Sequence, residues 1–382
     1  MSMILKNGKT IIDGKLKKSN IVCEGAYIKH VNSFDDCCFG DVIDCTNLYV
    51  FPGFIDCHIH GGGGGDSCNQ TIESYTKIVQ SQVKNGTTSI VLTIGGMSDE
   101  FVHESIDLTK RVNNLAVGAN ILGLHLEGPW INAEKRAAIP KEHLDEIGSI
   151  ERAKALVCGY EKDIKIITLA PEIPNVGAII EFLRKHNIAV SIGHTGASYD
   201  VTMNAVAAGA NSFTHLFNAS TPIVAREPGV VGAALCADEC YCELIADGYH
   251  VHPANIRYVL NSKKDNIVLV TDAIEVTGTD ATSFSLPGLD NIGVHDGRTW
   301  GPKDSLIGSI LTQHQALKNM MTWNMDELVA IVKMLTENPA KLLGIYPSKG
   351  CIKAGSMADF TIMDDNLNVV YTVVNGKVLY KK

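Results

Sequence analysis

The 382-residue sequence lacks the features that mark membrane, secreted and nucleic-acid-binding proteins. No apolar run approaches the roughly 18 residues expected of a membrane-spanning helix. No dense cluster of lysine and arginine is present, and the formal net charge of -9 argues against nucleic acid as a partner. The N-terminal segment has no charged stretch followed by an apolar one, so no secretory signal is predicted. We therefore expect a cytoplasmic protein with neither a membrane nor a nucleic-acid partner.

The 11 cysteines lack the spacings typical of metal sites and disulfide frameworks. No Cys-x-x-Cys pair occurs, and Cys240-x-Cys242 does not have zinc-finger spacing. An odd number of cysteines in a chain without a secretory signal favours reduced thiols. Cys57 lies between Asp56 and His58, and on a strand its side chain points away from that of His58. We expect the cysteines to be mostly small buried hydrophobic residues, and we expect no cysteine ligand.

Both ends of the chain have the pattern of short strands. Residues 1–50 contain the alternating segments MILKNGKTII, SNIVCEGAYIKHV and DVIDCTNLYV, which are typical of antiparallel strands. The last part contains ADFTIMD and then NVVYTVVNGKVLY, where Asn375-Gly376 predicts a hairpin turn. We predict one small β-sandwich built from residues 1–50 and 345–382, beside a main domain of residues 51–344.

Within the main domain, apolar strands alternate with segments of helical periodicity. The predicted strands are 50–57, 88–94, 121–126, 165–170, 188–193, 212–217, 242–247 and 266–271. The predicted helices are TIESYTKIVQSQVKNG, VGAIIEFLRKHN, VTMNAVAAGA and HPANIRYVLNSK, followed by 309–322 and 326–343. Eight strands with crossover helices predict an α/β fold, a (β/α)8 TIM-like barrel, with an open doubly wound sheet as the alternative. The Gly-, Asp- and Ser-rich segment 273–305 is predicted to be a long loop over the site.

Seven polar side chains lie at or just past the C-terminal ends of these predicted strands. They are His58, His60, Glu127, His194, His215, His250 and Asp272. In a barrel of parallel strands these ends converge on one mouth, where such residues are typically catalytic. The sequence therefore predicts one assembled site.

Histidine and carboxylate side chains dominate this set, and they suggest a metal site. His58 and His60 are two residues apart on a strand, so both project from the same face. Imidazole and carboxylate together suit Zn²⁺ or Fe²⁺ better than Ca²⁺ or Mg²⁺, which prefer oxygen ligands. Asp272 follows an apolar strand and needs a partner there. It either hydrogen-bonds to a neighbouring amide or histidine, or acts as a general base beside a water that the metal activates.

Two loop segments have less specific patterns. Arg226, in AREPG, suits a phosphate or carboxylate, but a solvated surface arginine is about equally compatible with the sequence. The glycines 61–65 do not form the G-x-G-x-x-G pattern that opens a helix and cradles phosphate. We predict a flexible loop beside the histidines.

A series of motifs resembles those of a known family. In chain order they are PGFIDCHIHGGGGGD, LHLEGPWIN, GHTGAS, THLFNA, REPGVVG, IADGYHVHPANIR, TDA and KGCIKAGSMADFTIMD. Together they resemble the N-acetylglucosamine-6-phosphate deacetylases of the amidohydrolase superfamily over essentially the whole chain. The resemblance implies a barrel with a β-sandwich and an enzyme that releases acetate from N-acetyl-D-glucosamine 6-phosphate.

The resemblance also implies a role for each residue of the strand-end set. Glu127, His194 and His215 would bind the principal metal ion. His58 and His60 would bind a second one, with Glu127 between the two ions, so that one or two divalent ions, Zn or Fe, are expected. Asp272 matches the acid/base that takes a proton from the attacking water and passes it to the departing amine.

The remaining residues implied by the resemblance would contact substrate. They are Ala138, Ile139, Asn218, Ala219, Arg226, His250, Leu306, Ile307 and Gly308. Asn218 and Ala219 would line the sugar phosphate, and Arg226 and His250 would contact phosphate across the interface of a homodimer. Residues 306–308 would lie against the substrate.

One departure from the family pattern concerns the sugar. The family has His or Gln where this chain has Ile139, which cannot donate a hydrogen bond, and losing such a donor can cost orders of magnitude in activity. Glu275 is also a charge not expected so soon after Asp272. The alternatives are therefore the same chemistry on N-acetylgalactosamine 6-phosphate or another N-acyl amino sugar, and, more remotely, a non-catalytic sugar-phosphate binder. A cyclic amidase is less compatible, because the strand ending at Leu169 offers no lysine to bridge two metals.

Overall fold

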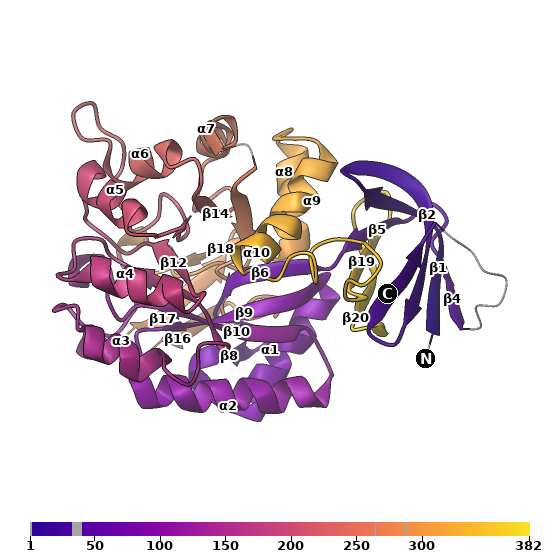
Figure 1. Cartoon of the computed structure of the whole chain (residues 1–382), viewed down its shortest axis with the longest axis horizontal. Helices are drawn as coiled ribbons and strands as arrows, with labels where there is room; N and C mark the ends of the chain where they lie inside the picture. Colours follow the sequence, from indigo (N-terminus) through magenta and orange to yellow (C-terminus); the bar gives the residue numbers. More distant parts are fainter. Residues whose placement is uncertain (1, 33–39, 264, 287–288) are drawn as a thin grey trace.

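The computed structural model describes residues 2–32, 40–263, 265–286 and 289–382, and its main body is a barrel of parallel strands (Figure 1). Its eight strands pair in the order β15-β14-β13-β12-β11-β10-β9-β6. They are β6 (Phe54–Ile59), β9 (Thr87–Gly95), β10 (Asn120–Glu127), β11 (Ile164–Leu169), β12 (Ala189–Ile192), β13 (Ser212–Phe213), β14 (Tyr241–Ile245) and β15 (Ile267–Val270). Nearly all of their residues are buried, which explains why they form apolar runs without alternation. The predicted (β/α)8 barrel is confirmed.

The barrel closes between β15 and β6, and it does so through residues next to the predicted site. The backbone N–H of Asp272 donates to the carbonyl of His58 at 2.8 Å. The hydroxyl of Thr271 donates to the buried carboxylate of Asp56 at 2.6 Å. The closing contacts therefore bring His58 and Asp272 together, although they are 214 residues apart in the chain (272 − 58).

Helices cover the outside of the barrel. They are α1 (Ile72–Lys84), α2 (Asp99–Leu115), α3 (Ile150–Val157), α4 (Val176–Lys185), α5 (Tyr199–Ala207), α6 (Gly229–Cys236), α7 (Pro253–Lys263), α8 (Gln313–Thr322), α9 (Leu328–Leu335) and α10 (Glu337–Leu342). The helix α4 shows why they pack there: it buries Val176, Ile179, Ile180 and Leu183, which form one stripe at helical spacing. Within the described ranges no helix is both long and apolar enough to span a membrane.

The single helix predicted over 326–343 is wrong, because the structure has two helices there. The helix α9 ends at Leu335, and α10 begins at Glu337 after Thr336, whose backbone is not helical (φ -136°, ψ -75°). Pro339 explains the break, since its ring clashes with the carbonyl four residues earlier, that of Leu335, and its nitrogen has no hydrogen to donate.

Strands from both termini form a second sheet, at the right of Figure 1, where both chain ends lie. Its members are β1 (Ser2–Ile12), β2 (Lys15–Glu24), β3 (Tyr27–Val31), β4 (Asp41–Asp44), β5 (Tyr49–Pro52), β19 (Phe360–Met363), β20 (Val369–Val374) and β21 (Lys377–Lys381). It has an apolar core of its own that includes Leu5, Ile21, Phe360 and Val373. The predicted pairing of the two ends is confirmed. So is the hairpin turn at Asn375-Gly376, where both residues have positive φ, 50° and 73°.

Two details of this sheet differ from the sequence prediction. The N-terminal strands are not all antiparallel, since β1 pairs with β4 and with β5 in parallel. The predicted strand 50–57 is two strands in different sheets, β5 and β6, separated at Gly53. A side chain at position 53 would lie 2.1 Å from the hydroxyl of Thr88, so only glycine allows the chain to pass this close to β9.

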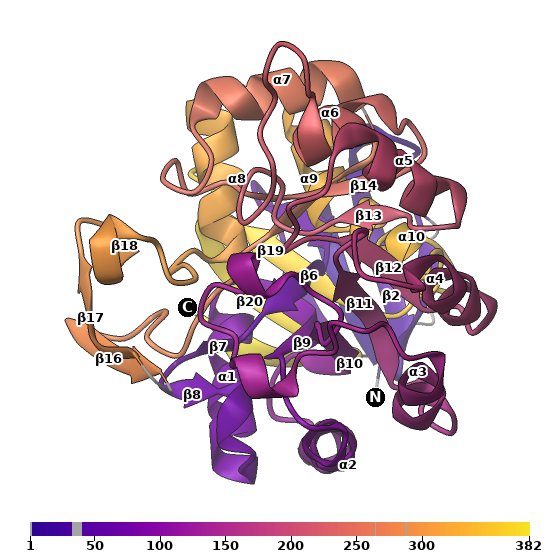
Figure 2. The same cartoon turned by 90° about the vertical axis from the view of Figure 1, so that its left-hand side faces the viewer.

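The segment predicted as a long loop over the site, 273–305, contains a small antiparallel sheet instead. Its strands are β16 (Ser283–Leu286), β17 (Leu289–His295) and β18 (Arg298–Trp300), which lie to one side of the barrel in Figure 2. A small apolar cluster that includes Ile274, Phe284 and Ile292 holds this sheet to the segment after β15. The strands are short and separated by turn residues, which explains why their alternation was too weak to predict them.

Candidate active site

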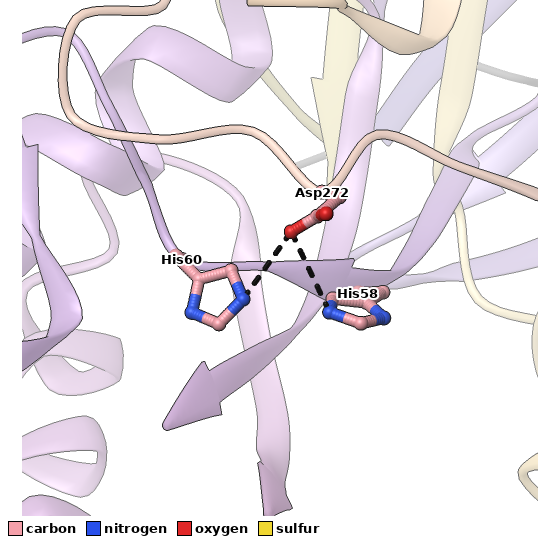
Figure 3. Close-up of side chains that lie close together, drawn as sticks. All are labelled: His58, His60 and Asp272. Carbon is pink, nitrogen blue, oxygen red and sulfur yellow. Dashed lines mark ion pairs between the residues drawn. The ribbon is translucent and has the colours of Figure 1, made fainter. Parts of the chain in front are cut away.

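His58, in β6, and His60, directly after this strand, lie at the mouth of the barrel beside Asp272 (Figure 3). The Nε2 atom of His60 lies 3.3 Å from Oδ1 of Asp272, and Nε2 of His58 lies 3.6 Å from the same oxygen. His58 is fully buried, while His60 retains 19% of its side-chain exposure. The pair therefore has an inner and an outer member.

His58, His60, Glu127, His194, His215 and Asp272 form one cluster of side chains at the mouth. Glu127, at the end of β10, lies at its centre. Its Oε1 lies 2.8 Å from Nε2 of His194 and 3.2 Å from Nε2 of His215. The same oxygen is 3.5 Å from Nε2 of His58, and the other, Oε2, is 3.5 Å from Nε2 of His60. One carboxylate thus faces four imidazoles that come from three strand ends.

Three members of the cluster have an unusual backbone conformation. His194, His215 and Asp272 each lie two residues past the end of a strand and have positive φ, 49°, 29° and 50°. Non-glycine residues in this region carry a cost of about 1–3 kcal/mol each, and they concentrate at functional sites. With these backbone conformations, the side chains of His194 and His215 face Glu127, and that of Asp272 faces His60.

The charges in the cluster shift one another's protonation. Burial alone lowers the pKa of His58, but Glu127 and Asp272 outweigh it and raise that pKa to about 10. Burial raises the pKa of Asp272, whereas His58 and His60 bring it well below its ordinary value. Burial also raises the pKa of Glu127, but His194 and His58 outweigh it and bring this pKa well below its ordinary value. Both carboxyl groups are thus ionised at neutral pH, and a cation that binds here displaces protons from imidazole.

The cluster has the composition and the free atoms of a metal site. At the mouth, two groups of residues each have potential ligand atoms within 4.8 Å of one another: His58, His60 and Asp272, and Glu127, His194 and His215. A third such group, His58 with His125 and Glu243, lies deeper in the barrel. In the described part of the chain, the buried Nε2 of His58 has no hydrogen-bond partner. The Nδ1 of His194 is held at 2.8 Å by the carbonyl of Lys135, which leaves Nε2 to face Glu127. This nitrogen and oxygen donor set fits a Zn²⁺- or Fe²⁺-type ion.

Two further polar residues lie inside the barrel below the cluster, and the sequence reasoning missed both. Glu243, on β14, is fully buried, and its Oε2 lies 3.1 Å from Nδ1 of His58. His125, on β10, is also fully buried, and its ring packs edge-on against that of His58. A charged or ionisable residue inside an otherwise apolar strand, as in YCELI and ILGLHLE, was the available indication.

Some residues predicted to contact substrate lie next to the cluster. Ile139 is buried, and a side-chain carbon added at Gly95 would lie 3.3 Å from Cγ1 of Ile139 and 3.9 Å from Oε2 of Glu127. At Gly308, an added carbon would lie 3.0 Å from the backbone carbonyl of Asp272. Ala138 and residues 306–307 flank these positions and are half-buried.

The other predicted substrate contacts lie on loops that leave the mouth. Asn218 lies three residues after His215 and is followed by Ala219, and the side-chain amide of Asn218 donates to the carbonyl of His215 at 3.1 Å. Nδ1 of His250 lies 2.6 Å from the carboxylate of Asp247. Arg226 is exposed on a tight turn, and no hydrogen bond or ion pair joins it to the cluster in the described structure.

The glycine run beside His60 is not the flexible loop that was predicted. Residues 61–62 and 65–66 form the short strands β7 (Gly61–Gly62) and β8 (Gly65–Asp66), joined by a turn with positive φ at Gly63 and Gly64. A side chain at Gly65 would lie 2.2 Å from the carbonyl of Ser74 on α1. The glycines thus allow a tight hairpin to pack against a helix. Glu275, the unexpected charge, accepts the N–H of Gly64 with its backbone carbonyl.

Known proteins are similar to this chain in sequence and in architecture. The family model "Amidohydrolase family" matches residues 49–379. An N-acetylglucosamine-6-phosphate deacetylase of Danio rerio is 34% identical over 365 residues, which are 91% of this chain and 89% of that protein. An N-acetylgalactosamine-6-phosphate deacetylase of Escherichia coli O157:H7 is 30% identical over 328 residues, 86% of each chain.

A solved structure extends the likeness to the whole fold. The crystal structure of N-acetylglucosamine-6-phosphate deacetylase from Pasteurella multocida has a TM-score of 0.92 and 30% identity, and the match covers 100% of both chains. The family model and these relatives both span most of this sequence. The chain therefore belongs to the amidohydrolase family.

Proposed function

We propose that this protein hydrolyses the N-acetyl group of N-acetyl-D-glucosamine 6-phosphate and yields D-glucosamine 6-phosphate and acetate, a step of amino-sugar catabolism. The observation that carries the proposal is the cluster around Glu127, in which one carboxylate faces four imidazoles beside Asp272. The relatives named above support the choice of an N-acetylated sugar phosphate.

The cluster suits one or two divalent ions, and we propose Zn or Fe. Glu127, His194 and His215 would hold the principal ion, and His58 and His60 the second, with Glu127 between them. When bound, such an ion supplies Lewis-acid activation of an amide carbonyl and of the attacking water. Because the cluster lies at the barrel mouth and is only slightly exposed, these residues also hold the scissile amide away from bulk water.

In this proposal Asp272 moves the proton. It is a carboxylate at neutral pH, so its Oδ atoms can accept a proton from the water that attacks the amide carbon. The carbon–nitrogen bond then breaks, and Asp272 returns the proton to the departing amine nitrogen. Acetate and the free amino sugar leave, and the carboxylate is restored. The carboxylate lies 3.3 Å from Nε2 of His60, so it is close to the ion that His58 and His60 would hold.

A second substrate is favoured by a specific observation. The deacetylase of E. coli O157:H7, 30% identical, is named for N-acetylgalactosamine 6-phosphate, the epimer at C4. Ile139 lies beside Glu127 and offers no hydrogen bond to a sugar hydroxyl. Recognition of the C4 hydroxyl therefore does not depend on this residue, and we retain N-acetylgalactosamine 6-phosphate as the alternative.

Steady-state kinetics with measured metal content test the proposal. Acetate release is compared for the 6-phosphates of N-acetylglucosamine, N-acetylgalactosamine and N-acetylmannosamine. We expect kcat/KM for the glucosamine epimer to exceed the others by about tenfold or more, because a site that hydrogen-bonds a hydroxyl rejects its epimer. A higher value for the galactosamine epimer would establish the alternative. No acetate from any of the three would refute deacetylation.

Arg226 gives a separate prediction about the phosphate. We propose a homodimer in which Arg226 and His250 contact the phosphate bound to the neighbouring subunit. Arg226→Ala is then expected to raise KM for the phosphorylated sugar about 10- to 100-fold, since a hydrogen bond to a charged group is worth about 1.5–3 kcal/mol. KM for unphosphorylated N-acetylglucosamine should change little. Arg257→Ala is the matched control, because Arg257 donates to the backbone carbonyls of Trp323 and Asn324. An equal effect of Arg226→Ala on both sugars would contradict the assignment.

A further inference from the structure

Glu243 is a buried carboxylate with two donors on one oxygen. Its Oε2 lies 3.1 Å from Nδ1 of His58 and also accepts the backbone N–H of His215 at 3.1 Å. Its other oxygen, Oε1, has no hydrogen-bond partner in the described part of the chain. Glu243 and His58 are both 0% exposed. Burying a carboxylate costs several kcal/mol unless its partners compensate, so this position calls for a specific role.

The contact with Glu243 determines which nitrogen of His58 is free. A carboxylate oxygen accepts, so the proton of the imidazole lies on Nδ1. When a bound cation displaces the second proton of the ring, Nε2 carries the lone pair. This nitrogen faces Oε1 of Glu127 at 3.5 Å and Oδ1 of Asp272 at 3.6 Å. A histidine that donates one nitrogen to a carboxylate and turns the other toward a cation is oriented as metal ligands commonly are.

The neighbouring His125 does not form a separate metal site with these two residues. Its Nδ1 lies 3.2 Å from the carbonyl of Cys57, and its Nε2 lies 2.7 Å from the hydroxyl of Thr168. Both nitrogens are therefore engaged, and neither is available as a ligand. Among the ring nitrogens of His58 and His125, only Nε2 of His58 lacks a hydrogen bond in the described part of the chain, and it faces the barrel mouth.

We propose that Glu243 is a positioning residue, which holds His58 in the Nδ1–H tautomer and directs its Nε2 at the ion shared with His60. This rests on the metal-dependent deacetylation proposed above. The same oxygen ties the backbone of His215 to this arrangement, so Glu243 links the two halves of the cluster from below. It contacts neither the substrate nor the reacting atoms in this role.

Two variants of Glu243 distinguish its hydrogen bond to His58 from the space that its side chain fills. Glu243→Met keeps the length of the side chain and removes the acceptor, whereas Glu243→Gln keeps an acceptor oxygen and removes the charge. The chelator-treated protein is titrated with Zn²⁺ in a calorimeter, and the wild type should bind two ions per chain. Glu243→Met is expected to weaken the His58–His60 ion by about 10- to 100-fold and to leave the other ion in place. Glu243→Gln should recover most of the lost affinity.

The tautomer of His58 is a second readout that depends on neither substrate nor turnover. In ¹⁵N-histidine spectra of the Zn²⁺-loaded proteins, assigned with His58→Asn, the wild type and Glu243→Gln should show Nδ1–H, and Glu243→Met should lose it. Thr168→Val is the matched control, since it removes a buried hydrogen bond to His125 at the same depth. Its Zn²⁺ affinity should equal that of the wild type.

Several outcomes would overturn the proposal. One is unchanged Zn²⁺ binding in Glu243→Met, and another is an Nε2–H tautomer of His58 in the Zn²⁺-loaded wild type. A third is an equal loss of both ions in Glu243→Met, which would mean that Glu243 acts through its hydrogen bond to the backbone of His215. If Glu243→Met does not fold, the proposal is tested by the tautomer of His58 in the wild type and by the Zn²⁺ affinity and tautomer of Glu243→Gln. If the Zn²⁺ and tautomer results hold but the wild type releases no acetate, the proposed function fails and the positioning role stands.

Discussion

Replacing Asp272 with asparagine is expected to lower kcat for deacetylation by about 10²- to 10⁴-fold, the range typical of a lost general acid/base. Asparagine has the same shape and leaves the hydrogen bond between the Asp272 backbone and His58 intact. It cannot accept the proton of the attacking water, since an amide oxygen is a far weaker base than a carboxylate. Metal content should stay within error of the wild type, because Glu127, His194 and His215 are unchanged.

The measurement is a pair of assays on the same preparation: acetate release under saturating substrate, and metal content by mass spectrometry. Glu275→Gln is the matched control, since Glu275 lies three residues further on, is half-buried, and is outside the two groups of potential ligands. It should retain nearly the full rate. Near-normal turnover in Asp272→Asn, or loss of metal together with rate, would remove Asp272 from its proposed role.

The second large effect is expected from Glu127→Gln. Glu127 faces four imidazole nitrogens, and it supplies the negative charge that offsets a cation among them. Glutamine has one neutral oxygen in place of two charged ones. We expect affinity for Zn²⁺ to fall by more than about 100-fold, beyond what the loss of an outer contact to a ligand costs. Deacetylation at ordinary metal concentrations should become undetectable.

Thermal unfolding with and without Zn²⁺ gives a readout that is independent of activity. An ion that binds only the folded chain raises Tm, and the rise shrinks as the affinity falls. The wild type should show a Zn²⁺-dependent rise in Tm that Glu127→Gln lacks. Glu134→Gln is the control, because Glu134 is an exposed carboxylate on the loop after the same strand. A rise in Tm and a metal content equal to those of the wild type in Glu127→Gln would contradict the central position of this residue.

The parts of the site that were predictable lie directly after strands. Glu127, His194 and Asp272 each end an apolar run, and parallel strands that pair in sequence order present their ends on one side. The grouping of these side chains could be inferred without coordinates for that reason. His250 has the same sequence position but is held by Asp247 on a loop and belongs to neither group of potential ligands. A position at a strand end therefore predicts on which side of the barrel a residue lies, but not which side chains it contacts.

The parts that were not predictable depend on residues that are distant in the chain. Glu243 appeared as one polar residue in an apolar strand, and its contact with His58 exists only because the barrel closes. The small sheet β16–β18 was hidden by short strands and frequent turn residues. The glycines 61–65 were predicted to form a flexible loop, whereas in the structure they allow a hairpin to pack closely against α1.

The sequence by itself determined the barrel, the pairing of the chain ends into one sheet, and seven strand-end residues, of which all but His250 meet at the mouth. These features could be predicted because local periodicity indicates which residues are buried and where each strand ends. Only the tertiary structure decided how those side chains face one another: which oxygen of Glu127 lies near which imidazole, and which nitrogen of His58 is turned toward the mouth. These distances are set by closure between β15 and β6 and by positive φ at His194, His215 and Asp272, and no periodicity encodes either.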